Sequence, residues 1–276
     1  MESRSTARRT DVGGGGERGR AERRTAERWG EDQIEGRHPV LEALRAGRPL
    51  RKLMVARGRT GGSLHLIIGE ARRRGVTVQE VDPSVITRLS QSRTPQGVIA
   101  YAATHQTVDL ADLLDSARAR SEAPFLLLLD GVEDPGNLGA ILRSAEAAGV
   151  HGVVIPRRRA AGLSPAVAAA SAGAIEHVRV AQVANIAQAI ERLKQGGVWC
   201  IGADAGGAQS IYETPLVPPV AVAVGGEGRG LSRLVRERCD LVMRIPMYGT
   251  TSSLNVSVAA ALALFEVRRQ MRASLP

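Results

Sequence analysis

Residues 249–266 read GTTSSLNVSVAAALALFE, and this stretch changes character halfway along. Its first half carries hydroxyl groups, a glycine and an asparagine, whereas its second half is almost entirely apolar. The apolar half predicts a buried helix that starts near Ser253. One helix cap needs one polar side chain, yet this helix mouth offers Ser252, Ser253, Asn255 and Ser257. The stretch therefore predicts more than a cap at the mouth of the last helix.

Upstream of this stretch, short apolar segments alternate with helix-like segments from residue 122 onward. FLLLLD (125–130), GVVIP (152–156) and VAVAV (220–224) have the composition of buried strands. Short apolar strands flanked by helices are typical of a parallel sheet with helices on both faces. Residues 122–276 are therefore predicted to form an α/β domain.

The preceding part of the chain predicts a second, smaller α/β module over residues 31–107. Its pattern includes a helix at 39–46 and a strand at 50–55, and residues 108–121 look like a helical linker. Residues 1–30 contain almost no large apolar side chains and a run of four glycines. Such a segment cannot bury enough surface to fold, so a disordered basic tail is expected there.

The positive charge is concentrated in the first part of the chain. The formal net charge is +9 and the pI is about 10.7. Residues 1–30 hold eight Arg against five acids, residues 31–107 hold twelve Lys and Arg against seven acids, and residues 108–276 hold seventeen against sixteen. The N-terminal segments are thus suited to a polyanionic partner, whereas the C-terminal domain is nearly neutral.

Several classes of function are disfavoured by the composition. Two cysteines do not make a disulfide framework, and no metal-ligand spacing or Ser/His/Asp set stands out among the five histidines. No apolar stretch approaches the ~18 residues of a membrane span, and the N-terminus lacks a signal-peptide core. We expect a cytoplasmic protein without a metal or a membrane anchor.

Two further strand-to-helix junctions offer polar groups besides the stretch at 249–266. In 129–150, LDGVEDPGNLGAILRSAEAAGV, Asn137 suits a helix N-cap, Gly139 permits close backbone approach, and Arg143 lies six positions after Asn137. Without further context, a capped helix with a solvated arginine explains this junction equally well. Ligands of open α/β sheets bind at the carboxyl ends of strands, so such junctions are the places to examine.

The other junction is VAVAVGGEGRGLSRL, residues 220–234. Its glycines do not follow the dinucleotide or Walker spacing. Glu227 between glycines would repel a phosphate but accept a hydrogen bond from a hydroxyl, an amine or a guanidinium. A plain tight turn is the alternative.

Together, DPGNLGAILRSAEAAGV, GGEGRGLS and IPMYGTTSSLNVSVAAALALFE resemble the three motifs of the SpoU (TrmH) family of RNA ribose 2′-O-methyltransferases. EGRHPVLEAL resembles the start of the substrate-binding domain that many members carry, so the resemblance covers residues 33–272. It implies a trefoil-knotted parallel-sheet domain of the SPOUT superfamily, preceded by a small ribosomal-protein-like RNA-binding domain. It also implies S-adenosylmethionine as cofactor, and a homodimer in which the site is completed across the subunit interface.

The resemblance assigns roles to individual residues. It implies catalytic roles for Asn137, Arg143, Glu227, Ser253 and Asn255. It implies cofactor contacts for Gly225, Ile245 and Leu254. A guanidinium is a poor base, so Arg143 is expected to bind the target phosphate and stabilise the developing alkoxide.

The layout is most similar to the subgroup that methylates a guanosine of large-subunit (23S) rRNA. A tRNA 2′-O-methyltransferase and a non-catalytic RNA-binding or ribosome-assembly protein are the alternatives. The chain departs from the family pattern after GVVIP, where Arg157, Arg158, Arg159 and Ala160 replace the usual Lys/Asp-Arg-Ser run. This arginine triplet is open to two interpretations, an RNA contact or a solvated turn.

Overall fold

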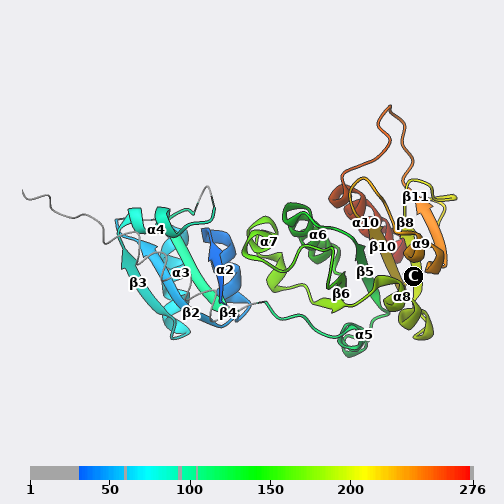
Figure 1. Ribbon diagram of the computed structural model, residues 1–276. Coiled ribbons are helices and arrows are strands. Elements are labelled where there is room, and N and C mark those ends of the chain that lie inside the picture. The colour runs from blue at the N-terminus through cyan, green and yellow to red at the C-terminus, as the bar shows by residue number, and fades with distance from the viewer. Residues whose placement is uncertain (1–30, 59–60, 93–94, 104, 274–276) are drawn as a thin grey trace, which may run out of the picture. The chain divides into compact units, whose positions relative to one another are not determined.

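The computed structural model describes residues 31–58, 61–92, 95–103 and 105–273 (Figure 1). The expected disordered tail, residues 1–30, lies outside the described residues. Contacts between Cα atoms divide the chain into two compact units. Among the described residues, the first unit holds 31–37 and 49–103, and the second holds 38–48 and 105–273.

The N-terminal elements build a mixed four-stranded sheet. In chain order they are β1 (Glu31–Glu35), β2 (Leu50–Ala56), α3 (Gly62–Arg73), β3 (Thr77–Val81), α4 (Pro83–Leu89) and β4 (Val98–Ala103). Helix α2 (Arg37–Arg45) lies between β1 and β2 in sequence, but from His38 onward it belongs to the second unit. The strand order is β1-β4-β2-β3, with β4 antiparallel to both neighbours and β2 parallel to β3. Helix α4 packs Ile86 and Leu89 against Met54 and Ile99 of the sheet.

The second unit contains a seven-stranded sheet among its described residues. Its elements are α5 (Leu110–Ala119), β5 (Phe125–Asp130), α6 (Pro135–Ala148), β6 (Gly152–Pro156), α7 (Pro165–Ala170), η1 (Ala174–Glu176), β7 (Val180–Val183), α8 (Ile186–Gln195), β8 (Trp199–Ala203), β9 (Gln209–Ser210), β10 (Val220–Gly225), α9 (Arg233–Arg238), β11 (Leu241–Arg244) and α10 (Val256–Ala273). The strand order is β7-β6-β5-β10-β8-β11-β9, and every neighbouring pair is parallel. The predicted parallel α/β sheet is confirmed.

Helices cover both faces of this sheet. Alternate residues of β5 point to opposite sides: Phe125, Leu127 and Leu129 join the core beneath α6, α7 and α10, whereas Leu126 and Leu128 join the core beneath α5, α8 and α9. Burial on both faces explains why the strands are apolar without alternation. Residues 108–121 are thus part of this packing, because α5 contributes Leu113 to the second core.

The order in which the chain adds strands to the sheet reverses between β5 and β10. The chain leaves β5 through α6 and enters β6 on one side, whereas it leaves β10 through α9 and enters β11 on the other. In an open α/β sheet, such a switch point opens a crevice at the carboxyl ends of the two strands. The loops after β5 and β10 therefore flank the expected binding crevice.

Helices α6 and α10 lie side by side with the same direction. Near their C-terminal ends, the Arg268 guanidinium donates to the carbonyl of Gly149 over 2.6 Å and lies 5.4 Å from the centre of the Phe125 ring. Near their N-terminal ends, Asn255 donates to Asn137 over 3.0 Å. This pairing brings the starts of both helices to the crevice.

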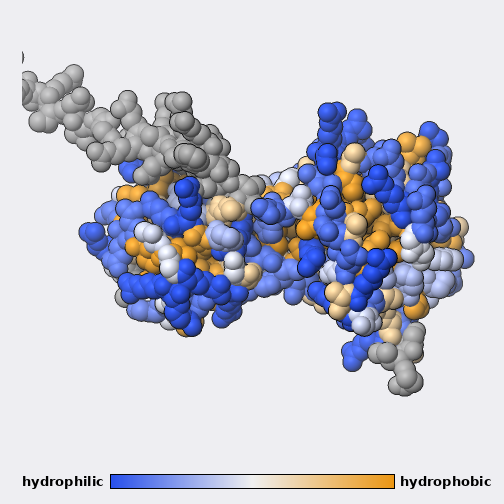
Figure 2. Space-filling model, turned by 90° about the horizontal axis from the view of Figure 1, so that it is seen from below, coloured by the Kyte–Doolittle hydropathy of each residue, from blue (hydrophilic) through white to orange (hydrophobic). Residues whose placement is uncertain are grey.

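Hydrophilic residues cover most of the face in Figure 2, and apolar residues form separate patches among them. No helix in the described residues is long and apolar enough to cross a membrane. Within the same residues, no group of three or more His, Cys, Asp and Glu side chains could hold a metal ion.

Both cysteines are expected to resist alkylation in the folded protein. Burial raises the pKa of the Cys200 and Cys239 thiols to about 12, so the reactive thiolate is scarce at neutral pH. A thiol reagent at about pH 8 should leave both residues unlabelled in buffer and label both in denaturant. Rapid labelling of either cysteine in buffer would contradict the raised thiol pKa.

Candidate active site

The Asn137 side chain lies in the first turn of α6 and is not needed to cap that helix. Asp134 caps the helix, accepting the backbone N–H of Asn137 at 2.7 Å. The prediction that Asn137 is the N-cap is therefore wrong. Pro135 takes the first helical position, which suits proline, so the cap falls on the residue before it.

The polar stretch before α10 forms the loop that follows β11 (Figure 1). Helix α10 begins at Val256, later than the predicted start near Ser253. The Asn255 side-chain oxygen accepts the backbone N–H of Ser257 at 2.9 Å and its hydroxyl at 2.6 Å. One residue thus supplies the cap, which leaves the hydroxyl of Ser253 for another purpose.

A hydrogen-bonded network joins the three loops. The Asn137 side-chain nitrogen donates to the Glu227 carboxylate, and its oxygen accepts from the Asn255 side-chain nitrogen at 3.0 Å. The same Asn255 nitrogen lies 3.5 Å from the Glu227 carboxylate. Because a carboxylate only accepts, the network fixes which end of each amide faces it. Glu227 therefore holds the Asn137 side chain in place.

The glycines of the loop after β10 are required by space. A Cβ on Gly225 would lie 1.9 Å from the carbonyl carbon of Gly230, and one on Gly226 would lie 2.0 Å from the carbonyl oxygen of Gly131. Gly226 and Gly230 also pair as an antiparallel bridge. At Gly225 and Gly226 the backbone of another residue therefore approaches too closely for any side chain.

Two aspartates that the sequence analysis did not single out hold this loop in place. Asp130, at the end of β5, accepts the backbone N–H of Ser232 at 2.7 Å. Asp204, just after β8, accepts the backbone N–H of Leu231 at 3.1 Å and pairs with Arg236 at 2.9 Å. Each is the first carboxylate after an apolar strand, a signal that FLLLLD and VWCIGAD both contain.

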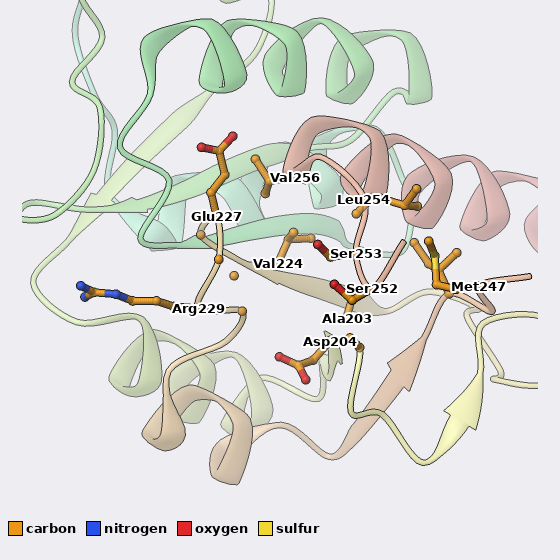
Figure 3. Close-up of a pocket in the computed structure, with 17 residues that line it drawn as sticks. Ala203, Asp204, Val224, Glu227, Arg229, Met247, Ser252, Ser253, Leu254 and Val256 are labelled. Atoms are coloured by element: carbon orange, nitrogen blue, oxygen red, sulfur yellow. The ribbon is translucent and has the colours of Figure 1, made fainter. Parts of the chain in front are cut away.

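A pocket of about 360 Å³ opens beside this loop (Figure 3), a volume typical of small-molecule sites. Its lining comes from the ends of β8, β10 and β11 and from the start of α10. The lining residues are Ala203, Asp204, Ala205, Val224, Gly225, Gly226, Glu227, Gly228, Arg229, Gly230, Ile245, Met247, Ser252, Ser253, Leu254, Val256 and Ala259. In Figure 3, Glu227 and Asp204 lie on opposite sides of Val224, and the Arg229 side chain points away from the pocket.

The pocket gathers most of the predicted residues. Those that line it are Gly225, Glu227, Ile245, Ser253 and Leu254. Asn137 and Asn255 are connected to it through Glu227. Arg143 does not line it; its side chain is exposed on α6 and, among the described residues, makes no hydrogen bond or ion pair.

The chemistry of the pocket suits a flat apolar ring with a cationic tail. Aliphatic side chains such as Val224, Ile245 and Leu254 offer contact to a ring, and the glycine loop lets a ligand approach its backbone. The Glu227 carboxylate would attract positive charge, whereas the Asp204 carboxylate is already paired with Arg236. S-adenosylmethionine carries an adenine ring and cationic sulfonium and ammonium groups, so it fits this pocket lining.

Comparison with known proteins agrees with this geometry. Residues 124–265 match the SpoU rRNA Methylase family, and residues 33–108 match the RNA 2′-O ribose methyltransferase substrate binding family. The chain is 42% identical over 239 residues to YacO of Bacillus subtilis, named as a TrmH family tRNA/rRNA methyltransferase, with 87% of this chain and 96% of YacO covered.

Two solved structures are similar along nearly the whole chain. The SpoU methyltransferase AviRb from Streptomyces viridochromogenes, in complex with AdoMet, is 27% identical with a TM-score of 0.74, covering 92% of this chain and 95% of its own. An AdoMet-bound rRNA methyltransferase from Sinorhizobium meliloti is 25% identical with a TM-score of 0.73, covering 92% of both chains.

Proposed function

The chain belongs to the SpoU rRNA methylase family, and from this premise we propose that it methylates a guanosine ribose of large-subunit rRNA. It is an S-adenosylmethionine-dependent RNA 2′-O-methyltransferase. The observation that carries the proposal is the network of Asn137, Glu227 and Asn255 at the rim of the pocket. We propose that the target ribose and the cofactor meet at this network.

When bound, S-adenosylmethionine supplies a methyl group on a sulfonium, which an attacking oxygen takes as the carbon–sulfur bond breaks. The task of the protein is then to orient the 2′-hydroxyl and to stabilise the charge that develops on its oxygen. We propose that Asn255 and Ser253 orient the ribose and the cofactor, with Glu227 keeping Asn137 in position. Gly225, Ile245 and Leu254 would hold the cofactor.

Two findings favour rRNA as the acceptor. The residues matched by the substrate-binding family coincide with the basic part of the chain, which suits a large folded RNA. The Sinorhizobium meliloti protein, similar along both parts of this chain, is named an rRNA methyltransferase. The name of YacO includes tRNA, which keeps a tRNA 2′-O-methyltransferase as the second candidate.

Transfer of a tritiated methyl group tests the acceptor. The full chain is incubated with labelled S-adenosylmethionine and with hypomethylated rRNA or tRNA, and the modified ribose is mapped. Label on a guanosine of large-subunit rRNA supports the proposal. Label on tRNA alone would favour the second candidate, and label on another rRNA nucleotide would replace the guanosine.

Replacing Arg143 with lysine is expected to lower turnover at least about 100-fold, with unchanged cofactor affinity. A guanidinium offers a planar fork of donors to a phosphate, whereas an ammonium is a point charge on a flexible stem. Turnover on rRNA and the S-adenosylmethionine Kd from calorimetry are the two measurements. Near-normal turnover would remove Arg143 from the proposed machinery.

The surface of α10 supports a homodimer. Val258, Leu262 and Phe265 form an apolar stripe on one side of the helix and are 46%, 44% and 50% exposed. The stripe starts beside the pocket loop, and α10 packs against α6, which carries Arg143. We propose that a second copy covers this stripe and receives Arg143 into its own pocket, since the pocket of one chain lacks that residue.

Placing glutamate at Leu262 is expected to convert the dimer into a monomer and to remove methyl transfer. The matched control is Leu234→Glu on α9, an equally exposed leucine at 47% on the opposite side of the sheet. Light scattering coupled to size-exclusion chromatography reports the mass. A wild-type monomer, or equal behaviour of the two variants, would contradict the proposed interface.

A cytoplasmic location and the trefoil knot stay predictions. The knot is supported by Gln270 on α10, whose side chain accepts the backbone N–H of Leu216 at 2.8 Å and donates to the carbonyl of Thr214 at 3.0 Å. These hydrogen bonds join the segment after β9 to α10. A trefoil knot in which α10 passes through a loop of the chain would need contacts of this kind.

A further inference from the structure

An exposed basic turn follows β6 and takes no part in the proposed chemistry. Arg157, Arg158 and Arg159 occupy it in succession, and all three side chains are exposed. Within the part of the chain that the structure describes, none of these side chains has a hydrogen bond or an ion pair. Their charges are therefore available to an external anion.

The arginines of α9 behave differently. Arg233 pairs with Glu237, Arg236 with Asp204, and Arg238 with Glu191, at 2.8, 2.9 and 2.8 Å. That basic run is neutralised within the molecule. The second unit thus supplies carboxylate partners to the arginines of α9. The three arginines of the turn after β6 have no such partner among the described residues.

The backbone of the turn is held at both ends. The N–H of Arg157 donates to the carbonyl of Val183 at 2.8 Å, and the N–H of Ala161 donates to the carbonyl of Val132 at 2.8 Å. Between them, Arg159 adopts a φ of 57°, a left-handed conformation that is unfavourable for a non-glycine residue. Val132 belongs to the loop that leads into α6, so the turn is joined directly to an active-site loop.

The position of the turn follows from the strand order. Strand β6 neighbours β5, and β5 neighbours β10, so the turn lies about two strand spacings, or about 10 Å, from the loop that carries Glu227. A stacked strand of nucleic acid advances about 3.4 Å per nucleotide. About three nucleotides therefore separate a ribose at the network from a phosphate at the turn.

A second pocket, of about 570 Å³, continues from the turn along the same edge of the sheet. Arg157 lines it together with Gln182, Asn185, Gln188 and Arg192. Asp109 also lines it, at the start of α5, where its backbone N–H donates to the Asp112 carboxylate at 2.9 Å. Guanidinium and amide groups suit phosphates and the edges of unstacked bases.

We infer that the arginine turn and this second pocket form an RNA-binding track for the nucleotides beside the target ribose. The inference rests on the proposed function only for the position of that ribose. It assigns the RNA contact to the catalytic unit itself, in addition to the basic N-terminal part of the chain. Of the two interpretations of the triplet, it selects the RNA contact.

Fluorescence anisotropy of the full chain tests the track. The probe is a labelled single-stranded RNA of mixed sequence, about 20 nucleotides long, titrated at KCl concentrations from about 50 to 200 mM. The test variant replaces Arg157, Arg158 and Arg159 with glutamine. The control replaces Arg118, Arg233 and Arg238, three exposed arginines paired with carboxylates, so both variants lose the same charge.

The test variant should bind at least about tenfold more weakly than the control at ~100 mM salt, and the slope of log K against log salt should be smaller by about 2. The corresponding lysine triple should keep the wild-type slope, because lysine still neutralises phosphates. Equal affinity and slope in the test and control variants would overturn the inference.

This measurement is independent of methyl transfer. If rRNA proves not to be the acceptor while the test variant still loses RNA affinity, the proposed function fails and the track stands. If rRNA is methylated and the two glutamine variants bind RNA alike, the proposed function stands and the track fails. An unchanged melting temperature and S-adenosylmethionine affinity confirm that the test variant is folded.

Discussion

Replacing Asn255 with aspartate is expected to lower methyl transfer turnover at least about 100-fold, while thermal stability stays close to that of the wild type. Asn255 has two separable functions in the structure. Its oxygen caps α10 by accepting from Ser257, and its nitrogen donates to Asn137 and faces Glu227. Aspartate keeps the first function and removes the second.

The loss should be large because the substitution also adds repulsion. The new carboxylate would stand where a nitrogen now lies 3.5 Å from the Glu227 carboxylate, and two like charges at that distance oppose each other. Asn137 would lose its donor and could turn away from Glu227. The Asn255 amide that we propose to orient the ribose would be lost, and Asn137 would no longer be held from both sides.

Ser257→Ala is the matched control for this experiment. It removes the 2.6 Å hydroxyl contact to the same Asn255 oxygen but leaves the amide nitrogen in the network. Turnover on rRNA within about threefold of the wild type is expected for this control. Because aspartate keeps the cap, an unfolded Asn255→Asp protein would instead show that folding depends on the amide network. A folded, fully active one would remove the network from the mechanism.

The parallel sheet could be predicted from the sequence because burial on both faces leaves a direct mark, an unbroken apolar strand. The three polar junctions could be predicted as one site for a related reason. The carboxyl ends of parallel strands meet at one edge of a sheet, whatever their separation in sequence. For this reason Asn137, Glu227 and Asn255 meet at one edge, although more than a hundred residues separate Asn137 from Asn255 in sequence.

The exact helix starts could not be predicted in this way. Asp134 and Asn137 both suit an N-cap, as do Ser253 and Asn255. Pro135 decides the first case, and in the second Asn255 serves as both the cap and a partner of Asn137. The role of Asp204 depends on the contact between β8 and the loop after β10, which local sequence does not encode.

Replacing Gly225 with alanine is expected to weaken S-adenosylmethionine binding at least about 100-fold, a loss of ~2.7 kcal/mol. The added Cβ would lie 1.9 Å from the backbone of Gly230, and a backbone atom cannot move aside as a flexible side chain can. The loop would have to open at the Gly226–Gly230 bridge. Opening it would displace the wall against which we propose the cofactor lies.

Gly162→Ala is the matched control, because a Cβ there meets no atom within 4 Å and the backbone is not in the left-handed region. Calorimetric affinity for S-adenosylmethionine and the melting temperature are measured for both variants, and only Gly225→Ala should lose affinity. Leu254→Arg is the second test, should Gly225→Ala not fold. It leaves the glycine loop intact but brings a cation into a pocket that we assign to a cationic ligand. Unchanged affinity in Leu254→Arg, or in a folded Gly225→Ala protein, would mean that the cofactor binds elsewhere.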